Sequence, residues 1–154
     1  METELDMKLT QQPKSFSVND PNGQSRTFHV QVRLDPIGIF MEAEEEVDNG
    51  YAFSVHGERV CNQAELFAKL VDKVRRGIET KYVTDLHTPD GYKIQAIKDD
   101  QVVGRLDYDK WNEDGPLTVI DGRPYTWEQL GRLVRQFEGF QFQIKFFDVT
   151  DEVE

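Results

Sequence analysis

The chain has 154 residues, with 18 basic and 29 acidic side chains and a net charge of −11. This length fits one domain of ordinary size, which can bury a core without disulfides or metals. The negative charge argues against nucleic acid or an anionic membrane as the partner, because both attract positive surfaces. No apolar stretch approaches the length of a membrane span, and the acidic residues after Met1 do not resemble a secretion signal. We therefore expect a cytoplasmic globular protein.

The first half of the chain has the alternating pattern of an antiparallel meander. Polar residues 1–12 end at a proline and are predicted to form a disordered arm. Apolar and polar side chains then alternate in four runs, over residues 16–18, 28–34, 37–43 and 51–55. Turn sequences such as Asp20-Pro21-Asn22-Gly23 separate the runs. Because the connections are short, we expect consecutive strands to pair antiparallel.

A helix is predicted from about residue 63 to residue 79. Asn62 is a good N-cap, and Glu65 stands three positions later as in a capping box. Apolar side chains then recur at spacings of three and four residues, which indicates one buried stripe: Leu66, Phe67, Leu70, Val71, Val74 and Ile78.

The second half is predicted to contain further strands and a second helix. Alternation indicates strands near residues 92–96, 102–108 and 117–120. Thr126 is the expected N-cap of the helix, with Gln129 at the third position, and Gly139 is expected to end it. A last strand is predicted from a run of apolar side chains on one face: Phe140, Phe142, Ile144 and Phe146.

These elements predict an α+β fold in the form of a two-layer sandwich. Most predicted strands are apolar on one face only, and two amphipathic helices are available to cover that face. The simplest arrangement is a mainly antiparallel sheet with both helices packed on one face. In this interpretation residues 13–149 form a single domain between the disordered arm and an acidic tail over residues 150–154.

Few residues have the pattern of a catalytic or metal site. The sequence has no Gly-rich phosphate loop and no nucleophile elbow, so we predict no cofactor. Cys61 precedes the first helix, whose dipole could lower its pKa, and His56 could serve as its base. A single cysteine is more often a small buried side chain, and we favour that role. The three histidines and Cys61 lack ligand spacing, so no metal site is predicted.

The strongest candidate for binding is an acidic strand. Glu42, Glu44 and Glu46 alternate along one strand face, so their like charges lie close together. Phe40 stands on the same polar side, and Arg33 stands on the polar side of the preceding strand. The run lacks the Gly-containing turn of a calcium loop. It suits either a solvated edge strand that its charge keeps soluble, which we favour, or a contact surface for a cationic partner.

Two stretches resemble a known family. The first runs from Phe53-Ser54-Val55-His56-Gly57 through Cys61 and Glu65-Leu66-Phe67 to Arg75-Arg76-Gly77, and the second from Ile120-Asp121-Gly122-Arg123 to Phe137-Glu138-Gly139-Phe140-Gln141-Phe142. Both look like segments of a family of uncharacterised bacterial proteins, classed as a domain of unknown function. The resemblance covers about residues 50–148. It implies a bacterial cytosolic source and no known activity.

Two functions follow as hypotheses. The first is a non-enzymatic protein-binding or adaptor domain that presents its acidic strand or polar sheet face to a basic protein. This hypothesis expects no nucleic acid and no membrane as partner, and it leaves a homodimer open. The alternative is a small thiol- or carboxylate-dependent hydrolase that uses Cys61 with His56, or Glu42 with Asp107. A deep pocket around such a pair favours the enzyme, and a flat acidic face favours the binding domain.

Overall fold

The computed structural model describes residues 14–153, and the predicted arm over residues 1–12 lies outside them. The chain divides into two compact units. Unit 1 contains the residues up to Asp48, Ala52–Glu79 and the C-terminal stretch from Lys145. Unit 2 contains Asn49–Tyr51 and Thr80–Ile144. Each unit has its own strands and its own internal contacts.

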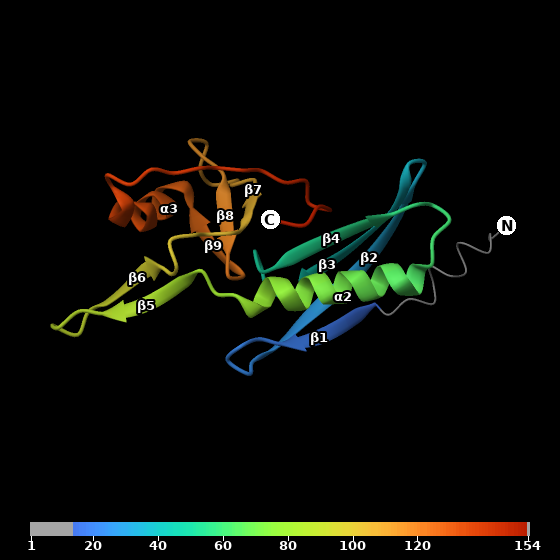
Figure 1. Ribbon diagram of the computed structural model, residues 1–154, viewed down its shortest axis with the longest axis horizontal. Helices are drawn as coiled ribbons and strands as arrows, with labels where there is room; N and C mark the ends of the chain where they lie inside the picture. The colour runs from blue at the N-terminus through green and yellow to red at the C-terminus, as the bar shows by residue number, and fades with distance from the viewer. Residues whose placement is uncertain (1–13, 154) are drawn as a thin grey trace. The chain divides into compact units, whose positions relative to one another are not determined.

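Unit 1 is a four-stranded antiparallel sheet with one helix (Figure 1). Its elements are β1 (Ser15–Asn19), β2 (Ser25–Asp35), β3 (Gly38–Glu45), β4 (Ala52–Gly57) and α2 (Gln63–Glu79). The strand order β1-β2-β3-β4 confirms the predicted meander. The predicted cap of the helix is also confirmed, because the Glu65 backbone N–H donates to the Asn62 side chain at 3.2 Å.

The core of unit 1 lies between one face of this sheet and α2. Side chains of both layers are fully buried there: Phe28, Ile39, Met41, Leu70, Val74 and Ile78. The helix approaches β4 closely at Gly77, where a Cβ would collide with the ring of Phe53. The glycine that weakens the last turn of the helix therefore allows this packing. The other face of the sheet carries the polar members of each alternating strand.

The C-terminal stretch of unit 1 is attached to α2. Lys73 is 9% exposed, and its ammonium donates to the backbone carbonyls of Ser54 at 2.7 Å, Val149 at 3.0 Å and Asp151 at 2.9 Å. Arg76, three residues after Lys73 on the helix, donates to both carboxylate oxygens of Glu152, at 3.0 and 3.1 Å. Two basic side chains of the helix thus fix a segment that has no regular structure.

Unit 2 contains two small sheets and a short helix. The hairpin of β5 (Val83–His87) and β6 (Lys93–Ile97) is separate from the three-stranded sheet of β7 (Arg105–Asp107), β8 (Leu117–Ile120) and β9 (Arg123–Thr126). The helix α3 (Trp127–Val134) continues into a 3-10 turn, Arg135–Phe137. Its capping box, formed by Thr126 and Gln129, is as predicted. The buried cluster consists of Ile97, Ile120, Tyr125 and Leu133.

The predicted fold class is wrong. The described strands belong to three separate sheets, and the two helices do not cover one face of a single sheet. Instead, α2 packs against β3 and β4, whereas α3 packs against β6, β8 and β9. The strands of unit 2 have only three to five residues and pair with their neighbours in sequence. Alternation identifies strands but does not state which of them share a sheet.

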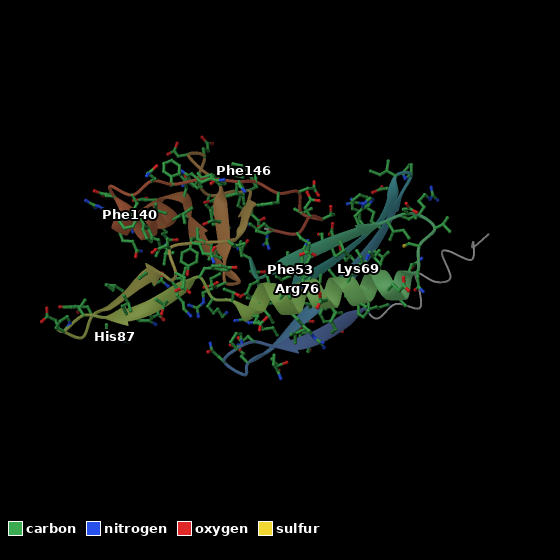
Figure 2. The ribbon with its side chains drawn as sticks, viewed as in Figure 1. Phe53, Lys69, Arg76, His87, Phe140 and Phe146 are labelled. Carbon is green, nitrogen blue, oxygen red and sulfur yellow. The ribbon has the colours of Figure 1, made fainter. Side chains whose placement is uncertain are left out.

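The predicted last strand is also wrong. The segment from Gly139 to Val149 is irregular and exposed, and Phe142 retains 86% of its accessible surface. Figure 2 shows Phe140 and Phe146 on this segment. Its side chains alternate as in a strand, but a strand also needs a hydrogen-bonded neighbour. Within the described residues this segment pairs with no strand edge.

Candidate binding face of the four-stranded sheet

The predicted binding residues lie together on one surface of unit 1. We call this surface the polar face: Arg33, Phe40, Glu42, Glu44 and Glu46. The first four alternate with buried or half-buried apolar residues along β2 and β3. Glu46 lies just beyond β3, but its backbone N–H donates to the Thr27 carbonyl at 3.0 Å and extends the ladder. Strand periodicity and antiparallel register therefore bring all five to the side opposite α2.

One end of the polar face is a row of three stacked side chains. Arg33, Phe40 and His56 stand directly opposite one another on β2, β3 and β4. The Arg33 guanidinium carbon lies 4.7 Å from the centre of the Phe40 ring, and the ring centres of Phe40 and His56 are 4.6 Å apart. Arg33 also donates to Asp35 at 2.8 Å. Phe40 is half-buried by these neighbours. The row therefore presents a surface that is aromatic at Phe40 and His56 and cationic at Arg33.

The other end of the polar face is acidic. Glu42 stands between Gln31 and Ser54 in the register, and neither of these can neutralise its charge. Glu44 stands opposite His29, and the His29 Nε2 lies 2.5 Å from a Glu46 carboxylate oxygen. Like charges on one strand face repel one another, so a cation bound here relieves a cost that the free protein carries.

Glu45 shows how different the opposite face is. It points toward the core side of the sheet, where it accepts a 2.8 Å hydrogen bond from Arg26. Arg26 also donates to the buried carboxylate of Asp20 at 3.1 Å. Successive side chains of a strand point to opposite faces of the sheet, so the acidic residues separate. Glu45 is neutralised by Arg26 on the core side, whereas Glu44 and Glu46 face solvent.

Cys61 and His56, the thiol pair of the hydrolase hypothesis, lie on opposite sides of the sheet. The Cys61 Sγ lies beside Gly57, 3.2 Å from the point where a Cβ would stand, and near Leu66 of α2. His56 points to the opposite face of the sheet, toward Phe40. Asp107 is held by Arg105 through two hydrogen bonds, at 2.8 and 2.9 Å. In residues 14–153 no group of three His, Cys, Asp or Glu side chains could hold a metal ion.

Cys61 is expected to react slowly with iodoacetamide in the native protein and quickly in urea. Burial raises the pKa of its thiol, and the carboxylates of Glu58 and Glu65 raise it further against the opposing effect of Lys69. Because the thiolate is the reactive form, a raised pKa lowers the reaction rate at neutral pH. The measurement is the rate of mass gain, with Cys61→Ser as the unlabelled control. Equal rates in buffer and urea would contradict a structural role.

The alternation of the strands predicts the polar face but not the part that His56 plays in it. His56 is a candidate base and metal ligand in the sequence, whereas the strand register puts it in the aromatic row. Its position after Val55 in an alternating strand was the available signal.

In the part of the chain that is described, no helix is long and apolar enough to cross a membrane.

Comparison with known families divides the chain near the boundary between the two units. Residues 10–79 match the model of a domain of unknown function, DUF7686, and residues 82–151 match that of a second, DUF7713. No curated protein and no solved structure matches the chain.

Proposed function

We propose that this chain, which belongs to the proteins built from the domains of unknown function DUF7686 and DUF7713, is a non-enzymatic protein-binding module. Its polar face would bind a basic segment of another protein. The observation that supports this proposal is the combination of Glu42, whose strand neighbours cannot neutralise it, with the stacked row of Arg33 and Phe40. A bacterial, cytoplasmic setting is part of the proposal, and the free thiol of Cys61 is compatible with a reducing compartment.

The two ends of the polar face suit different parts of such a partner. Lysine or arginine side chains would lie against Glu42 and Glu44, where each new ion pair also reduces repulsion between carboxylates. Arg33 and His56 cover the faces of the Phe40 ring, so an aromatic side chain of the partner would contact the exposed edge of that ring. Charges at the edge of an interface mainly affect the association rate and its dependence on salt. The acidic surface therefore favours fast, salt-sensitive association.

Removing the three carboxylates is expected to weaken binding of a basic probe. The probe is a fluorescent peptide of alternating lysine and serine, and the triple variant is Glu42→Gln, Glu44→Gln and Glu46→Gln. We expect its affinity to fall by about tenfold at low salt, and the difference to shrink as added salt shortens the screening length to about 4 Å. Fluorescence anisotropy measures the affinity, and duplex DNA should not bind at physiological salt.

The control variant removes the same charge elsewhere. Asp99→Asn, Asp100→Asn and Glu113→Gln change exposed carboxylates of unit 2. Asparagine also tolerates the positive φ of Asp99 and Asp100. This variant should bind the probe nearly as well as the natural chain. If both triple variants lost affinity equally, net charge alone would explain the binding and the polar face would have no special role.

A further inference from the structure

The outer edge of β1 offers backbone groups to another strand. Val30 donates its N–H to the Lys14 carbonyl, and Asp20 donates its N–H to the Gln24 carbonyl. In an antiparallel pair such residues alternate with residues whose N–H and C=O point away. Ser15, Ser17 and Asn19 therefore direct their backbone groups to the edge opposite β2. Among the described strands, none pairs with this edge.

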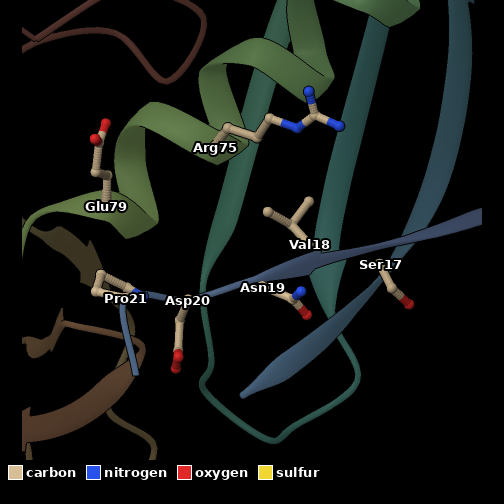
Figure 3. Close-up of a pocket in the computed structure, with 7 residues that line it drawn as sticks. All are labelled: Ser17, Val18, Asn19, Asp20, Pro21, Arg75 and Glu79. Carbon is tan, nitrogen blue, oxygen red and sulfur yellow. The ribbon is translucent and has the colours of Figure 1, made fainter. Parts of the chain in front are cut away.

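A cleft of about 660 Å³ runs along this edge. Figure 3 shows its two walls, which are formed by residues 17–21 on one side and by Arg75 and Glu79 of α2 on the other. Val18 and Asn19 both line the cleft, although alternate side chains of a strand point to opposite faces. The cleft is also lined by Asp20 and Pro21, so it lies at the end of β1, beside the edge that an added strand would use.

Arg75 supplies an available positive charge in this cleft. It is exposed, and it forms no hydrogen bond or ion pair with any other residue of the described chain. The adjacent Arg76 differs, because it is bound to Asp72 and Glu152. Asp20 also lines the cleft, but its carboxylate oxygens are engaged by the turn and by Arg26.

Glu79 places a negative charge one helical turn from Arg75. Four residues of an α-helix advance about 6 Å along its axis. Side chains on one face of an extended strand repeat every two residues, which is about 6.6–6.8 Å. In a bound strand that runs along α2, an acidic and a basic side chain two positions apart would therefore match the spacing of Arg75 and Glu79.

We propose that this cleft binds an extended peptide that adds to β1 as a fifth strand. The peptide carries an acidic side chain facing Arg75 and a basic side chain facing Glu79, two residues apart. Hydrogen bonds to Ser15, Ser17 and Asn19 supply affinity independent of sequence, and the two charges select among peptides. This surface is distinct from the polar face, so a partner segment could occupy one without the other.

The test uses the full chain and fluorescent peptides of threonine and valine. One peptide carries Glu and Lys two positions apart, and a second carries them at adjacent positions, where they point to opposite faces. We expect the first to bind about tenfold more tightly, and Arg75→Glu to remove this preference. Lys69→Glu is the matched control, because this exposed lysine of α2 does not line the cleft. The triple glutamine variant of the polar face should bind like the natural chain.

Strand addition has its own readout. Methylation of alternate backbone nitrogens of the first peptide removes its donors toward β1 and should abolish binding without changing any charge. Ser17→Pro should have the same effect, because that N–H points to the open edge and not to β2. Undiminished binding of the methylated peptide, or of the unmethylated first peptide to Arg75→Glu, would overturn the proposal. So would light scattering that shows a dimer whose dissociation is required for the peptide to bind, since a second copy would then occupy the edge.

Discussion

Replacing Lys73 with alanine is expected to lower the free energy of unfolding by about 3 kcal/mol. Hydrogen bonds from a charged donor contribute about 1.5–3 kcal/mol each, and the cost of burying the ammonium offsets part of their sum. Its ammonium donates to three backbone carbonyls from two distant parts of unit 1. Burial lowers the pKa of Lys73, and the nearby carboxylates of Glu152 and Asp151 oppose that effect. Urea denaturation monitored by circular dichroism gives the change in stability.

Two further variants separate hydrogen bonding from packing at this position. Lys73→Met retains most of the volume but cannot donate, so it should lose most of the stability that alanine loses. Lys69→Ala changes an exposed lysine one turn earlier and should alter stability by no more than about 0.5 kcal/mol. Amide exchange at Thr150 and Asp151 should quicken only in the Lys73 variants. A methionine variant as stable as the natural chain would show that the three carbonyl bonds contribute nothing.

Replacing Asp20 with asparagine is expected to cost about 2 kcal/mol at neutral pH, because it removes the charge from a buried, hydrogen-bonded ion pair. Asp20 is 6% exposed, and it accepts hydrogen bonds from the backbone N–H groups of Asn22 and Gln24 and from the Arg26 side chain. Burial by itself would raise its pKa, but the backbone donors and Arg26 together hold the pKa below the ordinary value of 3.8.

The stability that the Asp20 carboxylate contributes should decrease as the pH is lowered. A carboxyl whose pKa is lower in the folded state stabilises the fold above the unfolded value, and this stabilisation is lost as the pH falls through the folded value. The difference in stability between the natural chain and Asp20→Asn should therefore be full above the ordinary value of 3.8 and shrink below it. Asp90→Asn, at an exposed turn, is the control with little effect. A difference independent of pH would contradict the charged role.

The local features of this protein can be read from the amino-acid sequence. The turn after β1, the caps of both helices and the alternation of β2 and β3 were all predictable, because each depends on residues a few positions apart. Alternation also predicted that Phe40, Glu42 and Glu44 share a polar face. Short connections then aligned Arg33 beside Phe40. The candidate binding face was thus accessible from periodicity and charge.

The way in which distant segments combine is visible only in the folded chain. Phe140 and Phe142 have the pattern of a strand, yet they have no strand partner among the described residues. Arg75 and Arg76 are neighbours of the same chemistry, but Arg76 is bound to Glu152, 76 positions away, whereas Arg75 faces the cleft along β1. Local turns and caps are selected by a few nearby atoms. Pairing of distant segments depends on small differences among many competing contacts, which no local pattern records.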